Sequence, residues 1–439
     1  MPLNIILRRE NLSNKANQPY LIQGTVAPGF ESVRVLYERN MQTLKEKSTQ
    51  LCVYHKDKKV VDLWASQDDS FSPDSLINVF SSGKSLETIA LASLVGQGLM
   101  NYTDKITDFW PEFGHKGKQD LTVAELMRHE AGLAAFDGSL DTQDLLTENI
   151  KKNKVGKIIE EHVQKYRPNG GSRREYHAVT RGWIVNEVFR RIEPAGRTIG
   201  EYLREDIGTP LGVDAIVGVK QEELSRRALV VPLGFKFVFW DSLKPRFLGR
   251  RMEFNFFQLT TKILRMIPVI RNSTTWGTPA PFKGMRGIRF FNEPALAMGE
   301  TPSANTHSNA RSLAKIAAMM SSRGKFIDQE FLSDSGWTAL HSEPVKANMG
   351  MGRSIFTQGG VAHFTPCNAN SSKLDKAFNT GREGFYGWMG LGGSIFQWHP
   401  THRIGFGYVP TSLNVVDILN ERGKAYQAEV LNCIEQLTK

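Results

Sequence analysis

A serine and a lysine three residues apart are the first pair in the chain with chemistry of their own. Ser81 and Lys84 belong to the run Ser81-Ser82-Gly83-Lys84, at the start of a stretch with helical apolar spacing. On a helix, residues three apart share a face. A serine hydroxyl is a poor nucleophile until a base takes its proton, and a lysine can be that base when burial or nearby positive charge lowers its pKa. The pair also fits a plainer interpretation, a serine that caps a helix ahead of a solvated lysine.

Two further segments could complete such a site. Tyr176, in Tyr176-His177-Ala178, precedes another helical stretch and could relay a proton between nucleophile, lysine and leaving group. The run Trp388-Met389-Gly390-Leu391-Gly392-Gly393-Ser394 enters a β-rich segment, where glycines let a backbone N–H approach a ligand closely. Each segment has a structural alternative: the tyrosine packs its ring at a helix entrance, and the glycines form a turn before an edge strand.

Apolar periodicity predicts the helices that would position these residues. After Ser81, apolar residues recur at i, i+3, i+4 and i+8, so we expect a helix with one buried face that ends at Gly96 and Gly98. A second helix is expected over 180–192, a short one over 122–129 and a closing one over 415–437. Residues 104–113 contain Pro111 and are expected to form a loop.

The strands are expected at the two ends of the chain. Residues 51–55 and 60–65 predict a β-hairpin, and residues 394–398 and 404–409 predict a second pair of strands. Strands first, a long helical middle and strands again are typical of an α+β protein with one antiparallel sheet flanked by helices and a mainly helical lobe.

Together these motifs resemble the serine β-lactamase-related superfamily, which includes class C β-lactamases, D-Ala-D-Ala carboxypeptidases and β-lactamase-like esterases. Residues 79–85 are similar to the nucleophile segment of that superfamily, and residues 176–183 to its tyrosine motif and following helix. Further similar segments follow in the family's order at 94–110, 126–133, 302–305 and 309–314. The likeness runs from about residue 28 to residue 409, with a gap at a basic segment. It implies the β-lactamase and penicillin-binding-protein-like α+β fold.

The resemblance also implies a reaction and catalytic roles. Ser81 would be the acylated nucleophile, Lys84 its general base or proton relay, and Tyr176 a partner in proton transfer. The backbone N–H groups of Ser81 and Leu391 would form the oxyanion hole, next to Gly390. The reaction would be acyl transfer through a serine ester and then hydrolysis, without a metal or an organic cofactor.

Two positions on the substrate side depart from the lactamase pattern. Ala178 replaces the asparagine of the family's Tyr-x-Asn, so an amide that could bind a substrate's acylamide group is missing. Trp388 heads Trp388-Met389-Gly390, where lactamases carry Lys-Thr-Gly, so an aromatic wall replaces an ion pair worth about 1.5–3 kcal/mol. We therefore expect a small ester or amide substrate, and favour an uncharged ester over a β-lactam or a D-Ala-D-Ala peptide.

Other side chains offer no rival catalytic centre. His129 is expected to be a structural hydrogen-bonding residue near a helix end, and His177 is expected to face away from the site, next to Tyr176 on the chain. A non-catalytic structural or filament-forming protein on the same fold is the alternative function. Retention of Ser81, Lys84 and Tyr176 together favours an enzyme, because a purely structural role needs none of the three.

Composition excludes several classes of protein. The chain has 439 residues, 40% apolar and 23% charged, which is typical of globular proteins and excludes a disordered or fibrous one. No run approaches the roughly 18 consecutive apolar residues of a membrane-spanning helix. The three cysteines lie too far apart for a disulfide framework and show no zinc-binding spacing: Cys52, Cys367 and Cys433.

The positive charge is concentrated in one segment. The net charge is +10, yet residues 226–290 hold thirteen Lys or Arg residues and only two acidic ones, so the rest of the chain is nearly neutral. This distribution argues against nucleic-acid binding by the whole chain, and no nucleic-acid fold signature is present. Prolines argue against one long helix in the segment. Its interleaved aromatic and basic residues are expected to form a lid or insertion over the active site, with a peripheral membrane contact through 226–290 as the alternative.

These observations give a domain plan. We expect an N-terminal extension over 1–27, a sheet lobe from 28–85 and 300–439, a helical lobe over 86–225, and the basic aromatic insertion over 226–299. The apolar stretch 3–7 is too short for the core of a signal peptide. A cytoplasmic location is favoured, with a mitochondrial presequence as the alternative, and the oligomeric state stays open.

Overall fold

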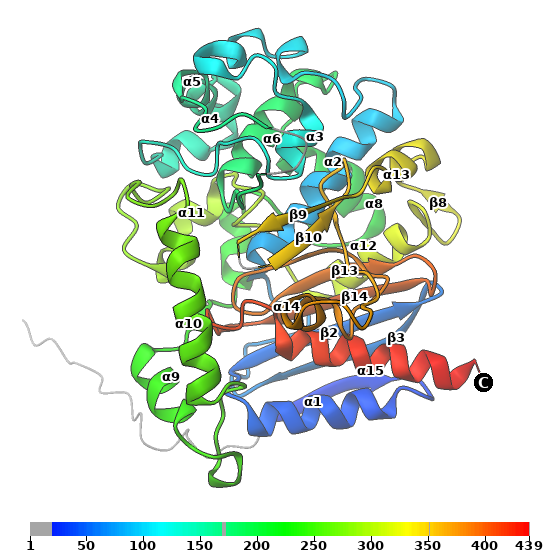
Figure 1. Ribbon diagram of the computed structural model, residues 1–439. Coiled ribbons are helices and arrows are strands. Elements are labelled where there is room, and N and C mark those ends of the chain that lie inside the picture. Colours follow the sequence, from blue (N-terminus) through cyan, green and yellow to red (C-terminus); the bar gives the residue numbers. More distant parts are fainter. Residues whose placement is uncertain (1–19, 169–172, 351, 439) are drawn as a thin grey trace, which may run out of the picture.

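A nine-stranded antiparallel sheet organises the computed structural model, which describes residues 20–168, 173–350 and 352–438 (Figure 1). The strand order is β1-β3-β2-β14-β13-β12-β11-β10-β9. The strands are β1 (Leu21–Val26), β2 (Ser48–His55), β3 (Lys58–Ser66), β9 (Val345–Met349), β10 (Gly352–Phe356), β11 (Ala362–His363), β12 (Tyr386–Met389), β13 (Ile395–His399) and β14 (Ile404–Pro410). Both expected strand pairs therefore exist, and the pairing of β14 with β2 joins the two ends of the chain in one sheet.

The sheet is covered on both faces. α12 (Ala310–Ser321) packs directly on β14, where a Cβ at Gly405 would lie 2.3 Å from the backbone nitrogen of Ala318. On the other face, α1 (Glu31–Thr43) and α15 (Glu421–Leu437) pack their apolar sides against the sheet (Figure 1). Because both faces are covered, all seven residues of β14 are buried.

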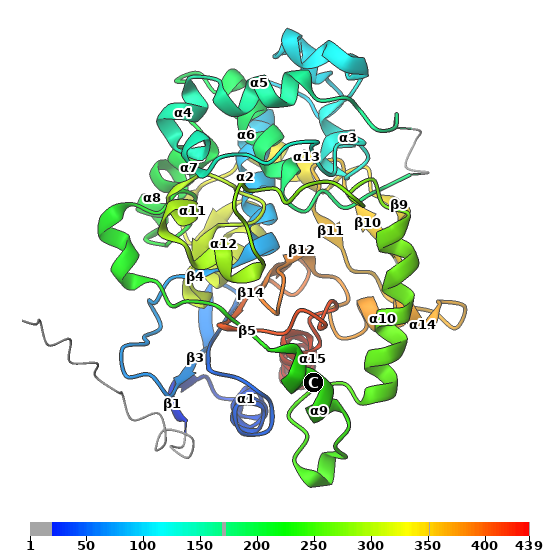
Figure 2. The ribbon, with the colours of Figure 1, turned by 90° about the vertical axis from the view of Figure 1, so that its left-hand side faces the viewer.

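The helical lobe stands on the same sheet, around α2 (Lys84–Gly96). Almost every residue of α2 is buried, and α6 (Thr180–Ile192) packs beside it at the bounds expected from the sequence. The remaining helices of this part are α3 (Val123–Met127), α4 (Thr147–Lys151), α5 (Lys154–Glu161), α7 (Ile199–Tyr202), α8 (Thr209–Leu211) and α13 (Asp334–His341). In Figure 2, α2 and α6 lie above the strands of the sheet, among the other helices of the helical lobe.

The basic segment runs down one flank of the molecule. It contains α9 (Phe235–Ser242) and α10 (Phe256–Arg271), and α11 (Pro294–Met298) follows it. Its first residues form β5 (Val231–Pro232), which pairs with β15 (Ser412–Leu413). The segment is divided into several helices, as its prolines predict, although Pro268 lies inside the last turn of α10. No helix in the described part of the chain is both long and apolar enough to cross a bilayer.

Several expected boundaries were wrong. The closing helix starts at Glu421 instead of 415, because Asn420 adopts a left-handed backbone (φ 50°) that ends the preceding irregular stretch. The loop expected over 104–113 contains 3₁₀ turns at Ile106–Asp108 and Pro111–Gly117. β1 already belongs to the sheet, so the sheet lobe begins before residue 28. Residues 1–19 of the expected extension, with the presequence alternative, lie outside the described residues.

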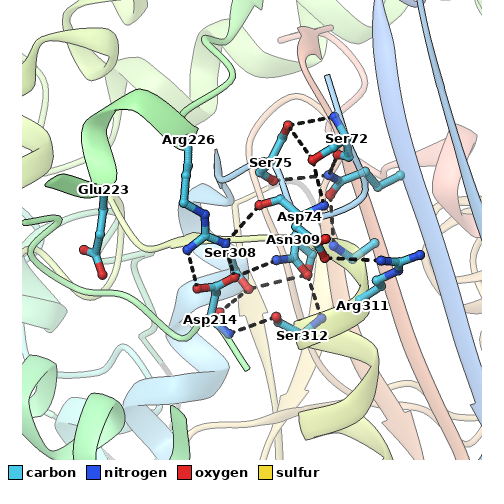
Figure 3. A network of polar contacts seen from close by, with 12 residues as sticks. Ser72, Asp74, Ser75, Asp214, Glu223, Arg226, Ser308, Asn309, Arg311 and Ser312 are labelled. Carbon is cyan, nitrogen blue, oxygen red and sulfur yellow. Dashed lines mark hydrogen bonds and ion pairs between the residues drawn. The ribbon is translucent and has the colours of Figure 1, made fainter. Parts of the chain in front are cut away.

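A polar network fixes the segment that leads to Ser81 (Figure 3). Asp214 is its centre: its carboxylate accepts from Arg226 at 2.6 and 3.0 Å and from the Asn309 amide at 3.0 Å. Arg226 also donates to the backbone oxygen of Asp74, at 3.0 Å. Two short strands complete the connection, β4 (Ile77–Asn78) and β6 (His307–Ser308). The start of the basic segment, the N-terminus of α12 and the approach to Ser81 are therefore held together.

Candidate active site

A strained turn presents Ser81. The chain leaves β4 and forms a 3₁₀ turn, Phe80–Gly83, that continues into α2. Phe80 has φ 47°, a left-handed conformation that is unfavourable for an aromatic residue. The Asn78 side chain accepts the Phe80 N–H at 2.8 Å, and the buried Phe80 ring lies 5.1 Å from that of Phe291. Such strain persists only where the surroundings impose it, and it is common at functional sites.

Lys84 lies beneath Ser81 and is almost completely buried, with 2% of its surface exposed. Its Nζ is 3.3 Å from Ser81 Oγ and donates to the backbone oxygens of Ala178 at 2.6 Å and Ser303 at 3.0 Å. Burial lowers the pKa of Lys84 well below that of an ordinary lysine; the nearby Glu87 carboxylate opposes this shift and the Arg181 guanidinium adds to it. A neutral amine has two N–H groups and one lone pair, so two carbonyl contacts leave the lone pair for the Ser81 hydroxyl.

Tyr176 brings a phenol to the same place. Its hydroxyl accepts the indole N–H of Trp388 at 2.9 Å, and Lys84 Nζ is 4.9 Å from the centre of its ring. Burial raises the pKa of Tyr176 to about 12, although hydrogen bonds with Ser81 and Trp388 oppose the shift. The phenol therefore keeps its proton at neutral pH and can donate it.

The glycine-rich run lies against the serine turn. A Cβ at Gly390 would lie 2.2 Å from the backbone oxygen of Val79. Ser394 ties the two segments together, since its Oγ donates to Val79 O at 2.7 Å and lies 3.0 Å from Ser82 Oγ. Ser81 and Leu391 both line one cavity. Within 20–168, 173–350 and 352–438, neither residue donates its backbone N–H to a protein acceptor, so both N–H groups are available for an oxyanion.

The cavity above Ser81 has a volume of about 720 Å³. Trp388, Tyr176 and Phe378 border it, and the Trp388 ring lies 5.9 Å from Tyr176 and 6.3 Å from Phe378 between centroids. Phe356 does not border the cavity but packs against Trp388 at 5.1 Å. The opposite wall comes from the end of α10 and includes Met266, Pro268, Val269 and Ile270. A mostly apolar chamber with a nucleophile at its base suits an uncharged acyl group.

Arginines also border the cavity. Arg174 is buried, and its guanidinium contacts the Glu130 carboxylate at 2.8 Å, a carboxylate that Arg128 also contacts at 3.2 Å. Arg173 and Arg353 are exposed residues that border the same cavity.

Three sequence expectations can be compared with these positions. Ser81, Lys84 and Tyr176 lie together, and Trp388, Gly390 and Leu391 border the same cavity. Ala178 was expected on the substrate side, but it does not line the cavity and contributes only its backbone oxygen.

The two histidines are structural. His129 Nδ1 accepts the backbone N–H of His177, whose Nε2 accepts that of Leu133, each at 3.1 Å. Burial lowers the pKa of both rings, so both stay neutral. No group of three or more His, Cys, Asp or Glu side chains that could hold a metal occurs among the described residues.

Some residues around the site were not found from the sequence. The Asn420 amide donates to the backbone oxygens of Gly390 and Ser394, at 3.1 and 2.9 Å. Arg422, buried at the start of α15, donates to the backbone oxygen of Gly392. The Ser303 oxygen that accepts from Lys84 is a backbone atom. Backbone acceptors leave no signal in residue types, so no motif could have identified these contacts.

Comparisons with known proteins agree with this geometry. A family model described as Beta-lactamase matches residues 36–428. Among curated proteins, the chain is similar to "Esterase/beta-lactamase LipL" of Mycobacterium tuberculosis, with 26% identity over 371 residues that cover 83% of this chain and 76% of LipL.

Solved structures show the same fold. A family VIII carboxylesterase superposes with a TM-score of 0.73 at 23% identity, covering 94% of this chain and 100% of the esterase chain. A penicillin-binding protein homolog from Caulobacter crescentus gives a TM-score of 0.71 at 24% identity, covering 94% and 99%. The α+β fold expected from the sequence is confirmed.

Proposed function

Because the chain belongs to the Beta-lactamase family and is a serine hydrolase, we propose that it hydrolyses small uncharged carboxylic esters through an acyl-enzyme on Ser81. One observation carries the proposal. A buried lysine, held by two backbone oxygens, has its Nζ 3.3 Å from a serine hydroxyl that lines an apolar cavity. The family assignment and the esterase relatives favour an enzyme over the non-catalytic alternative.

Acylation begins at the Ser81 hydroxyl. Neutral Lys84 takes its proton while Oγ forms a bond to the ester carbonyl carbon. The carbonyl oxygen becomes an oxyanion, which the backbone N–H groups of Ser81 and Leu391 stabilise. The bond to the leaving oxygen then breaks. Tyr176 passes a proton to that oxygen and recovers one from Lys84, so an alcohol leaves and Lys84 is neutral again.

Deacylation uses water as the second nucleophile. The same Lys84 and Tyr176 pair takes the proton of the water as its oxygen attacks the acyl carbon. The bond to Ser81 Oγ breaks, the proton returns to Oγ, and a carboxylic acid is released. Every proton that Lys84 takes is given up again within the same half of the cycle, to the alcohol in acylation and to Ser81 Oγ in deacylation.

Two features support an ester over a β-lactam. Trp388 cannot pair with a substrate carboxylate, and the cavity walls are mainly apolar. LipL is named an esterase as well as a β-lactamase, and structural relatives include a family VIII carboxylesterase and EstA from Arthrobacter nitroguajacolicus.

A substrate panel tests the proposal. The wild-type chain is assayed on p-nitrophenyl acetate and butyrate, on the chromogenic cephalosporin nitrocefin and on a D-Ala-D-Ala peptide. We expect kcat/KM for the esters to exceed that for nitrocefin and the peptide by at least about tenfold, since a lost charge-assisted contact costs about 1.5–3 kcal/mol.

Ser81→Ala and Ser85→Ala form a matched pair for this assay. Ser85 lies in the first turn of α2, directly after the 3₁₀ turn that holds Ser81. Its buried Oγ has no hydrogen-bond partner among the described residues, so removing this hydroxyl should leave turnover intact. Ester hydrolysis that survives Ser81→Ala, or a preference for nitrocefin, would refute the proposal.

A further inference from the structure

An unusual surface lies beside the cavity. Residues 235–271, here called the α9–α10 surface, comprise α9, a 3₁₀ turn at Arg246–Leu248 and α10. In Figure 1 they form the lower part of the flank opposite the C-terminus, and Figure 2 views that flank. Large apolar side chains are exposed here: Phe235 (74%), Trp240 (65%), Phe247 (85%), Leu248 (63%), Phe257 (80%) and Leu264 (61%).

Three of these side chains, Phe235, Trp240 and Phe257, belong to a connected cluster of rings. Phe239 is 6.3 Å from Phe235, 5.3 Å from Trp240 and 5.8 Å from Phe256, and Phe256 is 6.1 Å from Phe257, all between ring centres. Five rings from α9 and the start of α10 therefore lie side by side. Contiguous exposed apolar area of this kind marks an interaction site.

The charged side chains of the α9–α10 surface that face solvent are all positive. It contains eight Lys or Arg residues and two acidic residues. Both acids point inward: Asp241 is buried and accepts the backbone N–H groups of Arg251 and Met252, while Glu253 pairs with Arg422 at 3.2 Å. The charged groups that face solvent are therefore cations.

α10 belongs to both the cavity and the patch. Leu259, Lys262 and Met266 lie on its inner face; Leu259 is buried and Met266 borders the cavity. Phe257 and Leu264 lie seven residues apart on the opposite face and point outward, because a helix returns to the same face after two turns. A helix that is apolar on both faces is normally covered on both. Here no part of the chain that the structure describes covers the outer face, where Phe257 and Leu264 are exposed.

We propose that the α9–α10 surface docks on an anionic phospholipid bilayer, and that the ester substrate is drawn from that bilayer. Exposed aromatic rings are suited to the lipid interface and the cations to anionic headgroups, each cation contributing about 1 kcal/mol. The second half of the proposal rests on the proposed esterase function, whereas the docking does not.

Other occupants fit less well. Two copies of the chain would bring two cationic surfaces together, which is repulsive. A nucleic acid would match the charge and stack on the rings. The exposed aliphatic residues Leu248 and Leu264 have no role in base stacking, but can enter an acyl layer.

Vesicle co-sedimentation of the full chain tests the docking. Phosphatidylcholine vesicles are compared with vesicles of equal parts phosphatidylcholine and phosphatidylserine, at low and at high salt. We expect sedimentation with the anionic vesicles and release by salt, because headgroup attraction is screened. Failure to sediment, equal binding to neutral vesicles, or equally tight binding of single-stranded DNA would overturn the proposal.

Variants locate the contact. Trp240→Ser with Phe247→Ser should reduce vesicle binding by about tenfold or more per ring, and Lys236→Gln with Arg246→Gln by about fivefold per charge. Val35→Ser with Ile327→Ser is the matched apolar control, since these side chains are 64% and 68% exposed elsewhere. Lys157→Gln is the control for charge. Equal losses in the controls, or a change in oligomeric state as the cause of the losses, would contradict the assignment.

A two-substrate assay separates docking from catalysis. None of the four substituted residues borders the cavity, so turnover of water-soluble p-nitrophenyl acetate should be unchanged. Turnover of a long-chain ester embedded in anionic vesicles should fall in parallel with binding. If the wild type binds vesicles but hydrolyses neither ester, the proposed function fails and the docking stands. If the variants hydrolyse the embedded ester as the wild type does, delivery from the bilayer is wrong.

Discussion

Lys84 occupies a position where its charged form is unfavourable. It is buried, its Nζ lies between two backbone oxygens, and the Arg181 guanidinium lies near it. These surroundings convert a common surface cation into a base for Ser81. The reaction at Ser81 depends on which protonation state of Lys84 is present, and kinetics can measure that state.

The pH dependence of ester hydrolysis should report Lys84. Catalysis needs the neutral amine, so kcat/KM should rise with pH through a pKa below the 10.5 of an ordinary lysine and then reach a plateau. Tyr176, with a pKa of about 12, keeps its proton over this range and adds no descending limb. Stopped-assay rates across the pH range measure the profile.

Lys84→Arg is the stringent variant for this prediction. Arginine stays protonated and cannot act as a base. We therefore expect kcat/KM to fall by at least about 10²-fold, in the range of general-base contributions. A flat profile in the wild type, or activity retained in Lys84→Arg, would show that another group takes the proton.

At the scale of elements, the site depends on how closely strand β12 and the serine turn approach. Gly390→Ala places a Cβ 2.1 Å from Ser394 Oγ and 2.2 Å from Val79 O, and the second of these atoms is backbone. We expect β12 to shift outward, with a fall of about 10²-fold in kcat/KM and a loss of about 1–3 kcal/mol in the free energy of unfolding. Steady-state kinetics and urea titration measure the two effects.

Gly138→Ala is the control, because nothing lies within 4 Å of its added Cβ. Similar losses in both variants would mean that the close approach at Gly390 is not what matters.

The ion pair between α2 and α6 is a second link between elements. Glu87 Oε2 accepts from Arg181 Nε at 3.1 Å, and neither side chain is exposed. Glu87→Gln leaves a buried guanidinium without its counter-charge, which costs about 3–5 kcal/mol of unfolding free energy. Because Glu87 raises the pKa of Lys84, the same change should also move the ascending limb of the pH profile to lower pH.

The exposed pair of Lys105 and Asp120 is the comparison for this variant. Asp120→Asn should leave the free energy of unfolding almost unchanged, because solvent screens this exposed pair. A limb that moves to higher pH in Glu87→Gln would contradict the electrostatic account of Lys84.

At the scale of the whole molecule, the sheet and the helical lobe share one cluster of buried apolar side chains. Val79, Leu86, Ile184, Leu313 and Trp398 belong to a single cluster of contacting buried side chains. They come from the serine turn, α2, α6, α12 and β13. We therefore expect calorimetry to show one unfolding transition, with equal calorimetric and van't Hoff enthalpies. Two separated transitions would show that sheet and helical lobe unfold independently.

Local patterns predicted local structure well and long-range structure poorly. The helix over 180–192 was expected at the correct residues, because Ile184, Val185, Val188 and Phe189 repeat at helical spacing. The pairing of β14 with β2 joins residues more than 300 positions apart and has no local signal. β9 and β10 were not expected, and their five-residue runs Val-Lys-Ala-Asn-Met and Gly-Arg-Ser-Ile-Phe carry little β pattern.

The site itself was predictable only where a motif marks it. Ser81, Lys84 and Tyr176 came from motif resemblance, and the structure brings them together. The contribution of α10 to the cavity could not be foreseen, because it depends on where a 16-residue helix folds back over the sheet. Charge concentration in 226–290 indicated a special segment, but not which of its faces are open.

Covalent labelling tests whether Ser81 is a nucleophile activated by Lys84. The wild-type chain is treated with a fluorophosphonate, and the adduct is located by peptide mass spectrometry. We predict one modified residue, Ser81, with labelling abolished in Ser81→Ala, strongly slowed in Lys84→Arg and unchanged in Ser85→Ala. An adduct on another residue, or labelling of Ser81 at the same rate in Lys84→Arg, would contradict a serine activated by its buried lysine.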